Sequence, residues 1–501
     1  MSKPEKNSQA VKSPVVFIPI AALAIWAFLG GAVATIVWAE SDRDERRESV
    51  GEAHEQKQTD NAANNVVNSA VDVQSAIPDI LIGLLSGDST DIETDLAIVN
   101  ENWQPSMSAM LIESMMFARN AALQNALLDV LEQNTGESFG RNTQDWYQWL
   151  WAKDEERHPH YARFKSSLYA YLDPRFAAYF NNEFDTRIRL DEVRWGGVAQ
   201  DGIPPLRNPA MIAAADASYL DDDDVVFGVE INGDARAYPQ RILAWHEMFV
   251  DDIGGTNYAG VYCTLCGAVI LYETQHDEVQ HALGTSGFLY RSNKLMYDKD
   301  TQSLWNTTWG EPVIGHLVGN DIRLARSYVV TSTWGEWRRR HPQSSVLSLQ
   351  TGHQRDYGEG VAYQDYFATD KLMFDVPIKD ARLKNKDEIL ALQFPAVTEE
   401  RLAISAEYLK THPVYQHQLG SQQFVVLTDG SGANRVYETQ GVVFEQYDGD
   451  VTVVDDEGHA WTLTEAQLLK ADSSDTLKRL PAHRAFWFGW VAAWKDTQLV
   501  M

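Results

Sequence analysis

The sequence predicts an α+β protein: a transmembrane helix and a small all-α region precede a β-rich, internally duplicated domain. Three observations predict this class. They are an uncharged run at residues 15–39, apolar residues at helical spacing between residues 76 and 188, and short strand-like runs after residue 189. The chain has 501 residues, too many for a single hydrophobic core, so we expect several domains.

The run at residues 15–39, VVFIPIAALAIWAFLGGAVATIVWA, predicts a membrane anchor. It exceeds the roughly 20 residues that cross a bilayer and is longer than the apolar part of a cleavable signal peptide. Residues 1–14 would be an N-terminal tail, and residues 40–75 a polar linker. Because basic residues lie on both sides of the run, they do not fix its orientation. The short tail and large body favour a single-pass protein of the inner (cytoplasmic) membrane with a periplasmic C-terminal body.

Charge limits the partners of the chain. It has 42 Lys and Arg against 71 Asp and Glu, a formal charge of −29. Such a field repels phosphate backbones, so we expect no nucleic-acid partner. The expected partners are the lipid bilayer, through residues 15–39, and a protein that binds the helical region.

The helical region is predicted at residues 76–188. Apolar residues recur at spacings of three and four residues along MSAMLIESMMFARNAALQNALLDVLEQNTG, and Gly136 is typical of a helix end. Farther on, Trp146, Trp149 and Leu150 would share one helical face. These helix pairs resemble degenerate HEAT-type repeats, and an ordinary small helical bundle is the alternative.

The β-rich domain is predicted in two halves, residues 189–385 and 386–501. Asn232–Gly233 between two β-rich runs indicates a hairpin. Several residues recur at a constant spacing of 166 residues, which suggests an internal duplication. The matching pairs are Ala237 with Ala403, Leu243 with Leu409, His246 with His412, and Gly254 with Gly420.

The only two cysteines of the chain, Cys263 and Cys266 in VYCTLCGAVILYE, belong to the first half alone. At the repeat spacing they fall opposite Asp429 and Gly432. Cys-x-x-Cys-Gly between two strands is typical of a metal-binding turn, because the glycine allows a left-handed turn behind the second sulfur. We therefore expect a transition-metal site for Zn or Cu, with His246 as the third ligand. Further candidate ligands are Glu247, His276 and His281.

Two other interpretations of the cysteine pair stay open. The first is a thiol–disulfide redox pair, although the flanking residues favour strands rather than a thioredoxin-type βαβ unit. The second is an inert pair or a disulfide, which would close so short a loop that it would stabilise little.

Other polar side chains could line a pocket near the cysteines, although each could equally be a satisfied turn or sheet hydrogen bond. These candidates are Arg236, Tyr238, Glu247, Ser286, Arg291, Asn293, Asp298 and His483. No phosphate loop, GxSxG or HExxH motif is present. The catalytic residues are unknown from this pattern.

Several motifs in order resemble one bacterial family. They are WGGVAQDGIPPLRNP, FGVEINGDARAYPQRILAWHEMFVDDIGG, VYCTLCGAVILYE, GTSGFLYRSNKLMYDKDTQSLWN and LPAHRAFWFGWVAAWKDTQL. They are similar to the DUF3179 family, a domain of unknown function, over residues 190–500. The resemblance implies no activity and no catalytic residues. We therefore expect a metalloenzyme or metal-handling envelope protein, with a thiol–disulfide redox protein and a non-catalytic scaffold as alternatives.

Overall fold

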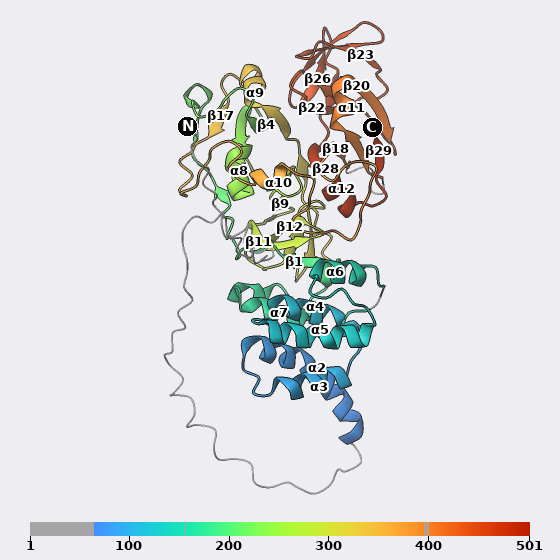
Figure 1. The fold of residues 1–501 in the computed structure, drawn as a ribbon. Helices are drawn as coiled ribbons and strands as arrows, with labels where there is room; N and C mark the ends of the chain where they lie inside the picture. Colours follow the sequence, from blue (N-terminus) through green and yellow to red (C-terminus); the bar gives the residue numbers. More distant parts are fainter. Residues whose placement is uncertain (1–64, 155, 395–396, 398–399) are drawn as a thin grey trace, which may run out of the picture. The chain divides into compact units, whose positions relative to one another are not determined.

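A computed structural model describes residues 65–501 except 155, 395–396 and 398–399. The predicted anchor at 15–39 and the N-terminal tail lie outside the described residues. Within the described part, no helix is both long enough and apolar enough to span a bilayer. Helices in the N-terminal part and strands after them make the protein α+β (Figure 1).

The helical region begins with α2 and ends before the first strand. Its helices are α2 (Asn65–Ser86), α3 (Ile92–Glu101), α4 (Ser108–Phe117), α5 (Ala121–Thr135), α6 (Thr143–Trp151) and α7 (Tyr161–Ala170). Local signals set the helix ends. Asn120 caps α5 by accepting a hydrogen bond from the backbone N–H of Leu123, and Gly136 ends it with φ of 73°. The apolar faces of these helices pack into one core with side chains of β11 to β14. A HEAT-type origin stays a prediction.

The first half of the β-rich part holds three five-stranded sheets. The first, in the order β16-β4-β5-β17-β3, contains β3 (Met211–Ala213), β4 (Val225–Ile231), β5 (Asp234–Pro239), β16 (Val330–Thr333) and β17 (Ser345–Leu347). The second, β15-β8-β7-β6-β2, contains β2 (Leu206–Arg207), β6 (Met248–Ile253), β7 (Thr256–Cys263), β8 (Ala268–Glu273) and β15 (Arg326–Ser327). The third, β1-β11-β12-β13-β14, contains β1 (Val193–Trp195), β11 (Leu283–Tyr290), β12 (Asn293–Asp298), β13 (Leu304–Asn306) and β14 (Glu311–Ile314). A short hairpin pairs β9 (Gln275–His276) with β10 (Val279–Gln280), and the helices are α8 (Gln240–His246) and α9 (Trp334–Arg340).

The second half also holds three sheets. The first, β28-β18-β19-β29, contains β18 (Glu388–Leu392), β19 (Leu402–Ser405), β28 (Ala482–Phe486) and β29 (Gln498–Val500). The second contains β20 (Val414–Leu419), β21 (Gln422–Thr428) and β22 (Asn434–Glu438). The third is a meander of β23 (Phe444–Tyr447), β24 (Thr452–Asp455), β25 (Ala460–Leu463), β26 (Gln467–Lys470) and β27 (Thr476–Lys478). The helices are α11 (Ala406–Thr411) and α12 (Trp487–Ala493).

The two halves share one topology. In the first half β4 lies between β16 and β5, and β17 joins β5 in parallel. In the second half β18 lies between β28 and β19, and β29 joins β19 in parallel. A short helix, α8 or α11, then leads into a three-stranded antiparallel unit, β6-β7-β8 or β20-β21-β22. An origin by duplication stays a prediction.

Each half packs the turn of its three-stranded unit against the other half. The turn between β7 and β8 contributes Cys263 and Cys266 to a core formed with Trp487 and Trp490 of α12. The turn between β21 and β22 contributes Ala433 to a core formed with two tryptophans of α9. This reciprocal packing places the cysteine turn inside the protein.

Residues 348–387, here called the linker segment, join the two halves. They run from the end of β17 to the start of β18 and contain only one short helix, α10 (Gln364–Phe367). The linker segment contacts α8 and the cysteine turn, as described below.

Candidate functional site

The two cysteines lie in the tight turn between β7 and β8. Cys263 is the last residue of β7, and its carbonyl accepts a hydrogen bond of 3.1 Å from the backbone N–H of Cys266. Gly267 follows with φ of 57°, a left-handed conformation that glycine adopts without strain. Both cysteines are free thiols. The predicted turn between strands is therefore present, and both sulfurs lie on one side of it.

Side chains and backbone from distant parts of the chain close over this turn. The backbone N–H of Phe486 donates to the carbonyl of Cys266 at 2.7 Å, and the hydroxyl of Tyr366 donates to the carbonyl of Leu265 at 2.8 Å. Gly489 of α12 lies so close that a Cβ there would be 2.9 Å from the Cβ of Cys266. Only 3% of Cys263 and 1% of Cys266 is exposed. The thiols are thus shielded by the second half and the linker segment.

A buried carboxylate and a buried amine lie beside the turn. Glu247 ends α8 in a left-handed conformation, which turns its side chain back towards Thr264, whose hydroxyl donates to Oε1 at 3.0 Å. Lys294, in the fully buried strand β12, donates from Nζ to the backbone carbonyl of Glu247 at 2.9 Å and lies 3.5 Å from its Oε2. Burial lowers the pKa of Lys294, while the charges of Glu247 and Cys263 oppose that change.

The surroundings move the pKa values of the two thiols in opposite directions. Burial alone would raise the pKa of Cys263, but hydrogen bonds from the Cys266 thiol and from the backbone N–H of Lys294 hold it below the ordinary thiol value. Burial raises the pKa of Cys266 well above that value, and the charges of Cys263 and Glu247 raise it further. One cysteine is therefore the favoured thiolate and the other the favoured thiol.

Both ring nitrogens of His246 are hydrogen-bonded to groups other than the sulfurs. Its Nδ1 lies 2.8 Å from the carbonyl of Pro204, and its Nε2 lies 2.7 Å from the hydroxyl of Tyr357. Because a carbonyl can only accept, Nδ1 carries the proton and Nε2 accepts from the tyrosine. Burial lowers the pKa of His246 to about 4, so the ring is neutral near pH 7.

A metal site is therefore not confirmed. Among the described residues, no group of three or more His, Cys, Asp or Glu side chains is placed to hold a metal ion. Of the other predicted ligands, His281 is paired with Asp298 at 3.1 Å, and His276 lies in the β9–β10 hairpin. Only Glu247 joins the two thiols in one cluster.

Several of the predicted pocket residues hold the sheets together instead. Arg236 and Tyr238 of β5 both donate to Asp251 of β6, in the second sheet, at 2.7 Å. Ser286 donates to the carbonyl of Leu295 at 2.6 Å, which stabilises a bulge between β11 and β12. Asp298 accepts from the backbone N–H of Thr301 at 2.8 Å and so closes a hairpin turn.

Two more predicted residues join the first half to α12. Arg291 pairs with Glu192 and donates to the carbonyl of Ala492 at 3.0 Å. Asn293 donates to the carbonyl of Gly489 at 3.0 Å, next to the cysteine turn. His483 is buried in β28 beside Trp490, and burial lowers its pKa to about 3. Arg291 and Asn293 therefore help to hold α12 over the cysteine turn.

Sequence reasoning missed Lys294 and the linker segment. Lys294 stands in NKLMYD, where a single lysine in an apolar strand is the signal for a buried amine that needs an anionic partner. Tyr363 and Tyr366 had no such signal, because nothing local tells that they cover a turn about a hundred positions earlier in the chain.

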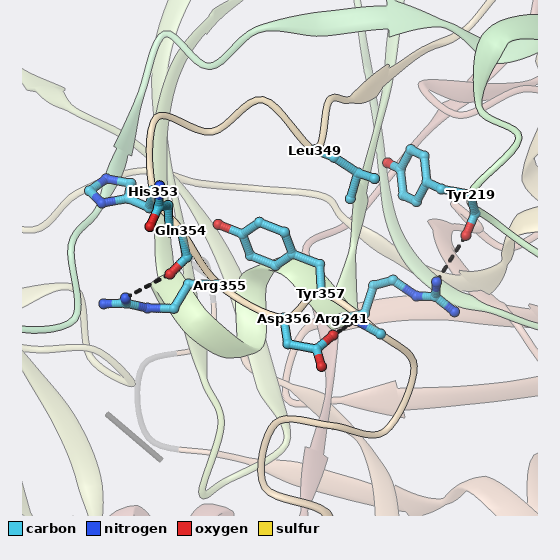
Figure 2. Close-up of a pocket in the computed structure, with 9 residues that line it drawn as sticks. Tyr219, Arg241, Leu349, His353, Gln354, Arg355, Asp356 and Tyr357 are labelled. Carbon is cyan, nitrogen blue, oxygen red and sulfur yellow. Dashed lines mark hydrogen bonds between the residues drawn. The ribbon is translucent and has the colours of Figure 1, made fainter. Parts of the chain in front are cut away.

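A cavity of about 750 Å³ lies where the linker segment passes α8 (Figure 2). In Figure 2, Tyr357 stands between His353 and Arg355 on one side and Arg241 and Tyr219 on the other. Tyr357 also contacts His246, so the cavity and the cysteine turn lie on either side of the end of α8.

One of three comparisons with known proteins found a match, and it agrees with the family motifs noted in the sequence. No curated protein and no solved structure matches the chain. The family model described as "Protein of unknown function (DUF3179)" matches residues 200–497, which include both cysteines, Glu247, Lys294 and the linker segment. That match covers more than half of the 501 residues, and the chain therefore belongs to the DUF3179 family.

Proposed function

We propose that Cys263 and Cys266 act as a redox dithiol that exchanges with a disulfide in a partner molecule. The observation that carries this proposal is the pair of free thiols in one turn with the buried carboxylate of Glu247 and the buried amine of Lys294 beside it, and the opposite directions of the two thiol pKa values agree with it. A nucleophilic thiolate and a protonated second thiol are what the first step of thiol–disulfide exchange requires.

The reaction proceeds in two displacements. The Cys263 thiolate attacks one sulfur of the partner disulfide, and the other partner sulfur leaves as a thiolate that takes up a proton. Cys266 then loses its proton and attacks the sulfur of Cys263, which releases the second partner sulfur as a thiol. Two electrons pass from the cysteine pair to the partner, so the protein ends with a Cys263–Cys266 disulfide and the partner with two thiols.

Lys294 and Glu247 supply charge and proton handling for these steps. The charge of Lys294 favours the Cys263 thiolate in the first step, since the two groups interact electrostatically. In the second step Cys266 must lose a proton in a site that disfavours its thiolate, and Glu247 is the carboxylate whose charge acts on both sulfurs. Glu247 is therefore our candidate acceptor of that proton.

Access to the thiols requires the cover to move. Of the groups that close the turn, Tyr363 and Tyr366 belong to the linker segment, where only four residues form a helix. Segments with few regular hydrogen bonds open at lower free energy than sheets do. We expect the linker segment, rather than α12, to uncover the cysteines.

Zn or Cu binding, with His246 as a ligand, stays the competing prediction. Two soft thiolates are in place, yet both ring nitrogens of His246 already have hydrogen-bond partners. The ring would have to leave Pro204 and Tyr357 and turn to the sulfurs. We rank this below redox exchange for that reason.

One set of measurements separates the two functions. The protein is purified without oxygen, its metal content is measured, and its thiols are equilibrated with mixtures of glutathione and glutathione disulfide before alkylation and mass spectrometry. We expect less than stoichiometric metal, a reversible Cys263–Cys266 disulfide, and a mixed disulfide on Cys263 that accumulates in Cys266→Ser. Stoichiometric metal that is lost in Cys263→Ser, or thiols that never interconvert, would overturn the proposal.

We also propose that residues 15–39 anchor the chain in the inner membrane with the body in the periplasm. The uncharged run supports an anchor, and disulfide exchange suits an oxidising compartment. We expect the protein to stay with membranes in alkaline carbonate and to be cut by protease added to spheroplasts. Release by carbonate, or full protection from protease, would contradict this placement.

A further inference from the structure

We propose that the cavity between the linker segment and α8 binds a small molecule that carries a carboxylate on an apolar or aromatic body. The lining residues include Tyr219, Arg241, Leu349, His353, Arg355 and Tyr357. The volume of about 750 Å³ lies within the range of small-molecule sites. No part of the proposed redox reaction accounts for this cavity.

The positive charge of the cavity comes from Arg355 rather than Arg241. All three nitrogens of Arg241 are engaged, since they donate to Glu359, Asp224 and the carbonyl of Tyr219. Arg355 makes one hydrogen bond, from Nη1 to the carbonyl of Gln354 at 3.0 Å. Within the described part of the chain its Nε and Nη2 have no hydrogen-bond partner, and these two donors match the two oxygens of a carboxylate.

The position of Arg355 is fixed by its neighbours. Its guanidinium lies 5.9 Å from the ring centroid of Trp245, and the indole N–H of Trp245 donates to the carbonyl of Asp356 at 2.8 Å. The ring of His353 stands beside it and has no hydrogen-bond partner among the described residues. The chain as a whole has a formal charge of −29 and repels anions. An arginine with two available donors at the cavity therefore attracts an anion to this place in particular.

Part of the remaining wall is apolar, and the carboxylate on it, Asp356, already accepts a hydrogen bond from the backbone N–H of Gly358. Leu349 is 42% exposed at the cavity, and Tyr219 and Tyr357 present their rings to it (Figure 2). A carboxylate alone would leave these surfaces in water, whereas an aromatic or aliphatic group would cover them. Inorganic phosphate lacks this part and should bind more weakly.

The linker segment connects the cavity to the cysteine turn. The effect of a ligand on the thiols, described next, rests on the proposed redox function. The linker segment supplies the cavity wall with residues 353–357, and six and nine residues after Tyr357 it covers the turn with Tyr363 and Tyr366. Tyr357 also bonds to His246, which precedes Glu247. A ligand that holds this wall in place should therefore change the rate at which the thiols become accessible.

Binding is tested by calorimetry on the purified full chain. The probes are benzoate and phenylacetate, with neutral benzamide and inorganic phosphate as comparisons. We expect saturable binding of the two carboxylates, weaker binding of the comparisons, and a loss of about tenfold or more in affinity in Arg355→Gln. Arg163→Gln, an exposed arginine of α7, is the matched control and should bind normally.

The outcomes separate this proposal from the redox function. No saturable binding of either carboxylate, equal binding of benzamide, or unchanged binding in Arg355→Gln would overturn the carboxylate site. The double variant Cys263→Ser/Cys266→Ser should bind benzoate as the wild type does, whatever the thiols do. The coupling is read from the alkylation rate of the wild-type thiols with and without benzoate: a change supports it, and an unchanged rate alongside normal binding removes it.

Discussion

The turn between β7 and β8 and the turn between β21 and β22 occupy equivalent places in two halves of one topology, yet they hold opposite chemistry. The first presents two free thiols beside Lys294 and Glu247. The second presents Asp429, which pairs with the fully buried Arg435 at 2.8 Å. Because the scaffold is the same, the side chains on the turn and on the facing strands must set the difference.

The neighbours of each turn explain why one is reactive and the other fixed. Arg435 lies between Asp429 and Glu465, and Arg479 pairs with the other oxygen of Glu465 at 3.0 Å. Every charge there has a partner, so the cluster ties sheets together. At the cysteine turn the hydrogen-bond donors to Cys263 are a backbone N–H and a second thiol, and neither of them is charged. The second turn therefore stabilises the fold, and the absence of a charged partner in the hydrogen bonds to Cys263 supports our proposal that the first turn exchanges disulfides.

The largest expected effect follows from removing Arg435. Arg435→Ala leaves Asp429 and Glu465 buried without their shared partner, and breaking such a pair costs about 3–5 kcal/mol. We expect the free energy of unfolding in urea to fall by that amount. Arg339→Ala removes an arginine that is half exposed and should cost less than about 1 kcal/mol. Equal losses in the two variants would mean that the cluster is no more important than surface pairs.

The second prediction concerns Lys294. Lys294→Met removes the ammonium group that favours the Cys263 thiolate, so the pKa of Cys263 should rise and its alkylation at pH 7 should slow. The alkylation rate as a function of pH measures this. The variant also leaves Glu247 unpaired, which should cost about 3 kcal/mol of stability. The double variant Glu247→Gln/Lys294→Met is compared with Glu247→Gln, because the charge of Glu247, which itself raises the pKa of Cys263, is then absent from both proteins. The double variant should regain stability, but its Cys263 should still have a higher pKa than in Glu247→Gln; equal pKa values would show that Lys294 only holds the fold.

The third prediction tests how tightly α12 closes the cysteine turn. Gly489→Ala places a Cβ 2.9 Å from the Cβ of Cys266, and such overpacking costs about 1–3 kcal/mol. We expect lower stability and faster alkylation of Cys266, because the turn and α12 must separate. Gly430→Ala, at the equivalent turn of the second half, adds a methyl group with nothing within 4 Å and should change neither. Slower alkylation in Gly489→Ala would mean that the methyl group only seals the site.

The sequence predicted the α+β class and the cysteine turn because both rest on local patterns. Alternating strands, the helix signals at Gly136 and the Cys-x-x-Cys-Gly run all act over a few residues. The family was also identified from ordered motifs and is confirmed. The partners of the thiols lie on other elements, so no local pattern indicates them. Lys294 comes from β12, and Gly489 comes from a helix about two hundred positions later.

His246 shows the limit of spacing arguments. It ends α8 and stands seventeen positions before Cys263, so spacing made it the natural third ligand. The structure turns its ring to Pro204 and Tyr357 instead, and Glu247, the next residue, faces the turn. Because Glu247 adopts a left-handed conformation with φ of 53°, neighbouring side chains point to different places, which sequence spacing does not indicate.

The smallest expected effect is a pH dependence that distinguishes His246 from its counterpart His412. Burial lowers the pKa of His246 from 6.5 to about 4 in the folded protein, so between these values the unfolded chain binds more protons than the folded one. The contribution of neutral His246 to the free energy of unfolding should therefore be fully present above pH 6.5 and should be lost as the pH drops towards 4. In His246→Gln this part of the loss should disappear, whereas His412→Gln, at an exposed position, should follow the wild type. Urea unfolding at several pH values measures the difference. Identical pH profiles in all three proteins would mean that His246 keeps its hydrogen bonds to Pro204 and Tyr357 when it is protonated. The inference that His246 is a neutral, fixed histidine beside the cysteine turn would then be wrong.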